Sequence, residues 1–446
     1  MKYNLDVKII PKEHYIKVKG SIKGIEAEHG ANIFYLNENF KINKLTSNQK
    51  DVGYMHNKIK PHPLYDETSR PVILNVPVEK LEFEYDGYIP EITNGINQID
   101  EDIVELAMYS GWYPKNFLYA ENTEEFDPNI GNRGFEFELN VELPPEYVFA
   151  ANAEIKNIDN SSKETTVYTL SSYGVDRGDI AIFASNKVIK TERIADGFTV
   201  SSICPPAMEK KNTLKLDMLI EAQKRITELL GEPIKILDTC YINRPRGGWG
   251  YARTATVFMP GITDENDESL KNLSKKSVIL DNSVDIHELA HFWWGISSST
   301  DSNDWISESG AEFTMLAIIK DMLRLEDYNS LIEKHGYIKH IKELVSDAAI
   351  CETKTDEWDA RYVIRYEKTA IMYNGAEIRF GKDNLFKFLK EFYEQNKTER
   401  RANTNKFLEL CEKVLGIEAR EYFNWLLSAK GWENIDIEKD ILLIKI

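Results

Sequence analysis

Hydrophobic and polar residues alternate along much of the first 200 residues of the chain. The clearest stretch covers residues 135–143, where Phe, Leu and Val alternate with Glu and Asn. A period of two is typical of a strand with one buried and one exposed face. Shorter apolar stretches at 16–18, 33–36 and 180–183 are separated by Gly, Asn and Asp, which favour turns. The pattern therefore predicts a β-rich domain in this part of the chain.

From residue 213 onward the period becomes that of helices. One apolar helical face, which ends at Gly231, is formed by Leu216, Leu219, Ile220, Ile226, Leu229 and Leu230. Further helices are expected at 315–326, 365–380, 384–395 and 405–415. The short apolar run Ser277–Leu280 predicts a strand instead. We place the boundary near Pro205, which gives domains of residues 1–205 and 206–446.

A group of metal-ligand residues follows this predicted strand. Residues 287–291 read His-Glu-Leu-Ala-His, and on a helix His287 and His291 lie one turn apart on the same face. Glu288 is poorly aimed to bind the same ion, but its carboxylate can take a proton from water. Glu308 would complete a His₂Glu set and leave a fourth position open, as a catalytic zinc site requires. We therefore predict one Zn²⁺ ion per chain.

Three alternatives stay open at this stage. The histidines could belong to an ordinary amphipathic helix, although the helix caps expected around residues 281–283 favour the metal site. Glu312, one turn beyond Glu308, could support the site or could be a solvated carboxylate. Asp304 could orient a zinc-bound histidine, or it could simply begin a helix.

The segments 287–295 (His-Glu-Leu-Ala-His-Phe-Trp-Trp-Gly) and 305–312 (Trp-Ile-Ser-Glu-Ser-Gly-Ala-Glu) carry a family resemblance. They resemble the HELAHxWxG and WLNEGxAE patterns of the aminopeptidase N family of zinc peptidases, which are gluzincins. The connection between the segments is shorter than in the family. The resemblance implies an N-terminal antiparallel β-sandwich domain followed by a thermolysin-like, mostly α catalytic domain. It covers most of the chain, and the C-terminal helical domain of many members is expected to be absent.

The resemblance also implies roles for single residues. Residues 365–370 resemble a Tyr-x-Lys-Gly segment, which makes Tyr366 the donor to the oxyanion of the reaction. Glu105, nine residues before Pro114, matches a family position that binds the substrate's amino group. Glu105 could instead belong to a solvated acidic stretch. Gly247 and Gly248 would let a substrate backbone approach closely, but their segment lacks the family's Met-Glu-Asn.

The resemblance thus implies a zinc aminopeptidase that acts on peptide N-termini. Because the usual amino-group clamp is altered, endopeptidase or oligopeptidase action is an alternative. A descendant that binds peptides without hydrolysing them is a second alternative, although the intact metal motif and base argue against it.

Length, charge and cysteine content limit the classes of protein to which the chain could belong. The chain has 446 residues, of which 42% are hydrophobic, enough for two or three packed domains. A net charge of −18 argues against a nucleic-acid partner, which would need a basic surface. The four cysteines are scattered, so neither a cysteine metal site nor a disulfide framework is expected.

The N-terminal residues contain no apolar signal segment, and no long uninterrupted apolar run occurs in the chain. We therefore expect a soluble cytoplasmic protein that does not insert into a membrane. Its expected partners are peptide substrates, and its oligomeric state stays open.

Overall fold

The computed structural model describes residues 1–443 with gaps. The residues outside the description are 26–32, 57–68, 90–97, 116–134, 175–178, 196–197, 234–237, 249, 262–269, 272, 298–301, 344–347, 353–361, 399–400, 431, 433 and 444–446.

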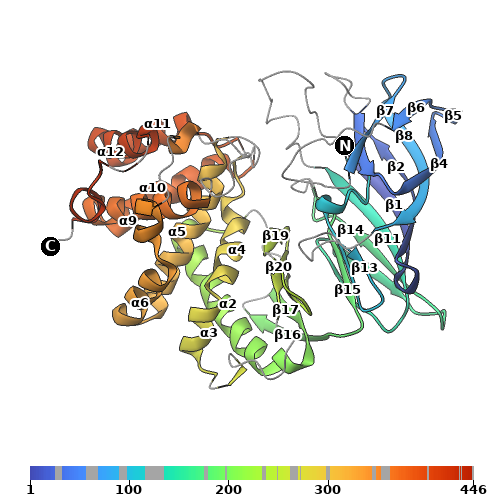
Figure 1. The fold of residues 1–446 in the computed structure, drawn as a ribbon, viewed down its shortest axis with the longest axis horizontal. Helices are drawn as coiled ribbons and strands as arrows, with labels where there is room; N and C mark the ends of the chain where they lie inside the picture. Colours follow the sequence, from blue (N-terminus) through green and yellow to red (C-terminus); the bar gives the residue numbers. More distant parts are fainter. Residues whose placement is uncertain are drawn as a thin grey trace. The chain divides into compact units, whose positions relative to one another are not determined.

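The chain divides into two compact units (Figure 1). The first unit comprises Met1–Glu192, Ser201–Glu209 and Thr239–Glu265, and the second comprises Arg193–Val200, Lys210–Asp238 and Asn266–Ile446. Strands make up most of the first unit and helices most of the second.

An eight-stranded sheet forms much of the first unit, in the order β13-β14-β11-β1-β2-β8-β4-β5. Its strands are β1 (Lys2–Ile10), β2 (Tyr15–Lys23), β4 (Phe40–Ser47), β5 (Lys50–Asp51), β8 (Lys80–Tyr88), β11 (Glu136–Leu143), β13 (Glu154–Asp159) and β14 (Thr166–Ser171). Side chains along β11 alternate between exposed and buried, which confirms the strand predicted from the period of two.

The pairing of β1 with β11 departs from the antiparallel arrangement expected for residues 1–205. β1 pairs with β11 in parallel, whereas β1 pairs with β2 antiparallel. The expectation is wrong at this pair because β1 and β11 are far apart in the chain. Strands joined by a long crossover can run parallel, whereas strands joined by a tight hairpin turn cannot.

Three smaller sheets complete the described strands, in the orders β12-β15-β10-β9, β3-β7-β6 and β16-β17-β18-β20-β19. Their strands are β3 (Ile33–Asn37), β6 (Tyr54–His56), β7 (Ser69–Leu74), β9 (Gln98–Ile99), β10 (Ile103–Leu106), β12 (Val148–Ala151), β15 (Ile182–Ser185), β16 (Ile189–Ala195), β17 (Phe198–Cys204), β18 (Thr239–Arg244), β19 (Tyr251–Arg253) and β20 (Thr256–Pro260). Apolar side chains of the first two of these sheets share one buried core with the eight-stranded sheet.

The helices that build the second unit follow the predicted apolar faces. They are α2 (Glu209–Leu230), α3 (Lys275–Asp281), α4 (Ser283–Trp294), α5 (Asp304–Met322), α6 (Leu325–His335), α7 (Tyr337–Glu343), α9 (Thr369–Phe380), α10 (Lys382–Asn396), α11 (Thr404–Leu415) and α12 (Ile417–Ser428). The π-helical turns η6 (Val363–Lys368) and η7 (Ile437–Ile441) accompany them. None of the described helices combines the length and apolar content that crossing a bilayer would need.

The strand predicted at Ser277–Leu280 is wrong, because these residues lie in helix α3. Ser274 forms a capping box with Ser277, in which the Ser274 hydroxyl accepts from the Ser277 amide at 3.1 Å. This cap begins the helix at Lys275, three residues before the apolar run begins at Val278. A run of four apolar residues does not distinguish a strand from one turn of a buried helix.

Candidate metal centre

Helix α4 presents two histidines on one face. The ring centroids of His287 and His291 lie 4.8 Å apart, as expected for residues one turn apart. His287 is buried, and His291 is half-buried. Glu288, the residue after His287, is also buried, with 8% of its surface exposed. The helix ends at Trp294, and the amide of the following Gly295 donates to the His291 carbonyl.

Glu308 on α5 meets both histidines. Its Oε2 atom lies 3.5 Å from His287 Nε2 and 3.4 Å from His291 Nε2. Two ligand atoms about 2.0–2.1 Å from a tetrahedral zinc ion lie about 3.3 Å apart, so this spacing suits zinc. The Oε2 atom is buried and has no hydrogen-bond partner among the described residues. These three side chains are the only cluster of metal-ligand residues found in the described part of the chain.

Close packing of α4 against α5 brings Glu308 to the histidines. A Cβ atom at Gly310 would lie 2.2 Å from Trp294 Cδ2, so only glycine allows this approach. The Trp294 indole donates to Thr314 Oγ1 at 2.8 Å, which fixes the register of the two helices. Just beyond α4, the hydroxyls of Ser297 and Ser307 lie 2.6 Å apart.

Glu312 supports the His287 ring from the other side. Its Oε2 atom lies 2.7 Å from His287 Nδ1, and its Oε1 atom accepts from the Tyr337 hydroxyl. Glu312 is 7% exposed, so the alternative that it is a solvated carboxylate is wrong. A carboxylate at Nδ1 holds the proton there and leaves Nε2 as the atom that binds a metal. Tyr337 carried no signal in the sequence, because α7 is remote from the motif along the chain.

The charges around the histidines favour a cation. Burial alone would lower the pKa of His287, but the carboxylates of Glu308 and Glu312 raise it to about 10. Burial alone would raise the pKa of Glu308, but His291 and His287 hold it well below its usual value. The pocket thus stabilises positive charge between these side chains, and the donor set is the one that zinc prefers.

Tyr366 lies against the same histidine. It belongs to the π-helical turn η6, a type of turn that often occurs at functional sites. Its ring stacks on the ring of His287 with centroids 5.5 Å apart, and on Tyr362 at 4.8 Å. Burial, then the charge of Glu308, raises the pKa of Tyr366 well above 10. The phenol therefore keeps its proton at neutral pH and can donate a hydrogen bond.

Asp304 is the first residue of α5 and forms a buried ion pair with Arg365 of η6. It begins a helix, as one of the two alternatives predicted. Through this pair, the start of α5 is joined directly to the turn that carries Tyr366.

Glu105, predicted to bind an amino group, lies in the first unit. It is completely buried, so the alternative of a solvated acidic stretch is wrong for this residue, although Glu101 and Asp102 are exposed. Its Oε1 atom accepts from Arg244 Nη1 at 2.9 Å and from the Tyr251 hydroxyl at 2.8 Å. Its Oε2 atom accepts from Arg246 Nη2 at 3.0 Å. Sequence reasoning missed these partners, which β18, β19 and the residues after β18 bring to Glu105.

The predicted backbone-approach glycines lie between β18 and β19. A Cβ atom at Gly247 would meet no atom of the described residues within 4 Å, and Gly248 has a φ of 119°. Both glycines are exposed, and the neighbouring position 249 lies outside the described residues.

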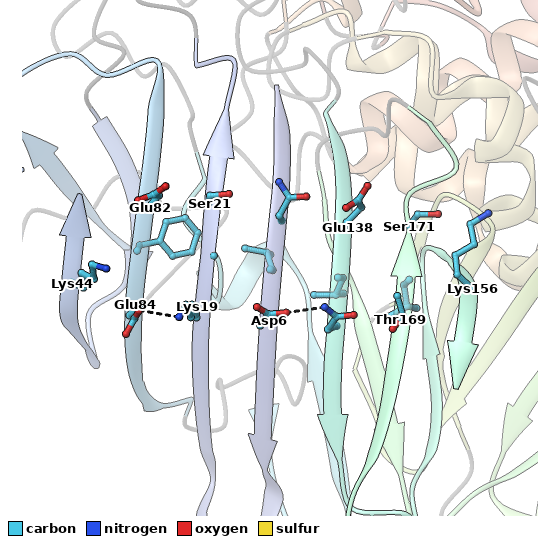
Figure 2. Close-up of a pocket in the computed structure, with 17 residues that line it drawn as sticks. Asp6, Lys19, Ser21, Lys44, Glu82, Glu84, Glu138, Lys156, Thr169 and Ser171 are labelled. Carbon is cyan, nitrogen blue, oxygen red and sulfur yellow. Dashed lines mark hydrogen bonds and ion pairs between the residues drawn. The ribbon is translucent and has the colours of Figure 1, made fainter. Parts of the chain in front are cut away.

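A hollow on the eight-stranded sheet differs from the candidate metal centre in how its charged side chains are arranged (Figure 2). Lys19 pairs with Glu84 on the neighbouring strand at 3.4 Å, whereas Glu138 and Glu82 pair with Lys2 and Lys80, which lie outside the lining. Asn140 likewise donates to Asp6 at 2.8 Å. Mutually satisfied charges on a sheet surface do not converge on a ligand, so we do not place the site there.

Comparison with known proteins finds a likeness in structure alone. No family model and no curated protein sequence matches the chain. The M1 zinc metallopeptidase from Deinococcus radiodurans is 14% identical with a TM-score of 0.68, covering 96% of this chain and 94% of that chain. A mutant of an M1 zinc metallopeptidase from the same organism, bound to a Tyr-Ser-Ala substrate, is 14% identical with a TM-score of 0.67 and the same coverage. Legionella pneumophila aminopeptidase A, in complex with aspartic acid, is 13% identical with a TM-score of 0.69, covering 96% of this chain and 49% of that chain.

The chain therefore has the fold of the M1 zinc metallopeptidases. This confirms, at the level of the fold, the resemblance to the aminopeptidase N family predicted from the sequence.

Proposed function

We propose that this chain is a zinc-dependent peptidase that removes residues from peptide N-termini. The observation that carries the proposal is the position of Glu308 Oε2, 3.4 and 3.5 Å from the Nε2 atoms of two histidines. A His₂Glu set of this kind leaves a fourth position open for water or substrate. The fold supports the same conclusion, since its neighbours include an enzyme with a bound peptide substrate.

Different side chains of the second unit would have different roles in the hydrolysis. His287, His291 and Glu308 would hold the ion, which when bound acts as a Lewis acid on water and on the scissile carbonyl. Glu288 accepts a proton from the attacking water and passes it to the leaving amine. Tyr366 donates a hydrogen bond to the oxygen that becomes negative during the attack. Glu312 keeps the His287 ring in place.

A second candidate function is endopeptidase or oligopeptidase action. It is favoured by the contacts of Glu105, the predicted partner of the substrate's amino group. This carboxylate already accepts from Arg244, Arg246 and Tyr251, so its charge is neutralised within the protein. A neutralised carboxylate attracts an ammonium group weakly.

One assay separates these functions. The zinc-loaded protein is given an aminoacyl fluorogenic amide and, separately, an N-acetylated peptide amide of the same residue. Cleavage of the free amine alone is the expected result and supports an aminopeptidase. Cleavage of both substrates supports the endopeptidase instead. Cleavage of neither, with zinc bound, contradicts hydrolysis and supports a peptide-binding protein.

The assigned base is tested by Glu288→Gln. This variant is expected to keep its zinc, because Glu288 is not a ligand, but to lose roughly 10²- to 10⁴-fold in kcat. Metal content is measured by mass spectrometry and turnover with the substrate that the wild-type protein cleaves. Glu418→Gln, at an exposed position on α12, is the matched control and should leave both unchanged. Near-normal turnover by Glu288→Gln would remove Glu288 from the reaction.

A further inference from the structure

A buried ion pair joins helix α5 to the turn that carries Tyr366. Arg365 Nη1 donates to Asp304 Oδ2, although 61 residues separate the two in the chain. The Arg365 side chain is completely buried, and that of Asp304 is 1% exposed. Removing two charges from water is costly, and well-packed apolar side chains of similar size often stabilise a fold as well or better. Stability alone therefore does not explain the pair.

Each end of the Asp304–Arg365 pair lies next to a residue that the proposed reaction uses. Asp304 precedes the candidate zinc ligand Glu308 by one helical turn, so both lie on the same face of α5. Arg365 directly precedes Tyr366 in the π-helical turn η6. After burial, the charges of Glu308 and then Asp304 raise the pKa of Tyr366, so both carboxylates lie near the phenol. The pair therefore connects the helix of a metal ligand with the residue that would stabilise the oxyanion.

The position of the Tyr366 hydroxyl depends on how the turn η6 is held. The Tyr366 ring stacks on those of His287 and Tyr362, with 20° between the planes in both pairs. Stacked rings tolerate a range of offsets, so stacking sets the plane of the phenol more firmly than the place of its hydroxyl in that plane. The backbone of η6 must supply the rest, and a π-helical turn is a rare conformation. Arg365 holds this turn twice, because its side chain forms the ion pair and its carbonyl accepts from the Thr369 hydroxyl.

We propose that Asp304 and Arg365 are positioning residues, whose ion pair holds the Tyr366 hydroxyl in place relative to Glu308. A donor to an oxyanion is effective when it is fixed where the negative charge will develop. A charged hydrogen bond is directional and can fix the turn in this way, whereas apolar contacts are not directional. The role of Tyr366 as the donor rests on the proposed function, but the placement of its ring does not.

A double-mutant cycle tests whether the pair acts through Tyr366. Asp304→Asn keeps an oxygen for Arg365 but loses the charge, so the turn is held less firmly. We expect kcat to fall about 10- to 100-fold with little change in KM, because a reacting group misplaced by about 1 Å has an effect of this size. In a Tyr366→Phe background, where the donor is already absent, Asp304→Asn should have no further effect. Equal fold-losses in the two backgrounds would overturn the proposal.

Two controls separate positioning from general damage to α5. Lys320→Gln breaks a different ion pair of this helix, with Glu377 of α9 at 3.0 Å, and should leave kcat unchanged. The zinc content of Asp304→Asn, measured by mass spectrometry, should equal that of the wild-type protein. Loss of zinc from Asp304→Asn would show that the pair holds Glu308 instead, and would contradict the assignment to Tyr366.

A second variant covers the case in which Asp304→Asn does not fold, which circular dichroism reveals. Asp304→Leu combined with Arg365→Met replaces the ion pair by apolar side chains. Such a replacement preserves stability better than a pair broken on one side. The same loss of kcat is expected, again absent in the Tyr366→Phe background. Wild-type kcat in this folded variant would mean that the ion pair does not position Tyr366.

The placement of the Tyr366 ring can also be measured without metal or substrate. The full-length, metal-free protein is labelled with carbon-13 on its tyrosine rings and studied by NMR spectroscopy. The Tyr366 signal is the one that is missing from Tyr366→Phe. A ring held in one place gives one sharp signal, so Asp304→Asn should broaden or divide this signal, whereas Lys320→Gln should leave it sharp. A Tyr366 signal that stays single and sharp in Asp304→Asn would overturn the proposal.

The two measurements distinguish failure of this proposal from failure of the proposed function. A wild-type protein that cleaves neither the aminoacyl amide nor the N-acetylated peptide amide would reject the peptidase. A change in the Tyr366 signal of Asp304→Asn would still support the positioning role in that case. A protein that hydrolyses peptides but shows equal losses in the two backgrounds would reject the positioning role alone.

Discussion

Two carboxylates hold His287 from opposite sides, and each acts on a different ring nitrogen. Glu308 faces Nε2 and Glu312 faces Nδ1, at 3.5 and 2.7 Å. The first contact lies where a shared ion would bind, and the second fixes the tautomer that allows binding. Tyr337 in turn donates to Glu312, so the orientation of the ring depends on a residue of a third helix, α7.

Glu312→Gln tests this support at the scale of one residue. An amide at this position accepts a weaker hydrogen bond from Nδ1–H and carries no charge. We therefore expect the affinity for zinc to fall about 10- to 100-fold. Competition with a chelator of known affinity measures the change. Tyr337→Phe, which removes only the hydroxyl that binds Glu312, should lower the affinity by less. An unchanged affinity in Glu312→Gln would show that this contact does not tune the site.

The residue scale also shows what the sequence could reveal about the site. The i, i+4 spacing of His287 and His291 gives their shared helical face directly, and the following Trp-x-x-Glu identifies Glu308. The role of Glu312 stayed open because the spacing of residues along one helix does not show which side chains of other elements cover the turn that carries Glu312. Arg246 drew attention only through its glycines, since its partner Glu105 is 141 residues away in the chain.

At the scale of elements, the pairing of α4 with α5 determines the geometry of the centre. All three candidate ligands lie on these two helices, and Trp294 packs directly on Gly310. The sequence predicted α10 and α11 well because their apolar faces are long. It missed the break between α5 and α6, since Leu323 and Arg324 are not residues that usually end a helix. The start of α3 was also missed, because the capping box at Ser274 that begins this helix lies outside the apolar run.

Gly310→Ala tests the close approach of these helices. The new methyl group would lie 2.2 Å from the buried Trp294 ring, so α4 and α5 must move apart. Overpacking of this kind costs about 1–3 kcal/mol of unfolding free energy. This loss outweighs the gain of roughly 1 kcal/mol that alanine brings to a helix. We expect a lower denaturant midpoint and weaker zinc binding, because Glu308 lies two residues before the substitution.

A double-mutant cycle identifies the clash as the cause. Trp294→Leu removes the ring that the new methyl group would meet, so Gly310→Ala should cost less in that background. An equal cost in both backgrounds would mean that the loss arises elsewhere on α5.

At the scale of the whole molecule, each unit contains one of the two groups of functional interest. The candidate metal centre belongs entirely to the second unit, and the Glu105 group belongs entirely to the first. Neither group needs a residue of the other unit for the contacts described above. Metal binding is therefore expected to be a property of the helical unit alone, and to change its stability in particular.

Removal of zinc should lower the unfolding temperature of the second unit. A ligand present at about 1,000 times its Kd stabilises the folded state by roughly 4 kcal/mol. In a unit of this size, each kcal/mol corresponds to about 2–4 °C. Calorimetry with a chelator should thus show a transition about 8–16 °C lower, restored when zinc is added back. Glu308→Gln is the control, because without the third ligand its transition should respond much less to either treatment. If the transition temperature of the wild-type protein changes with neither chelator nor zinc, then His287, His291 and Glu308 do not hold a metal.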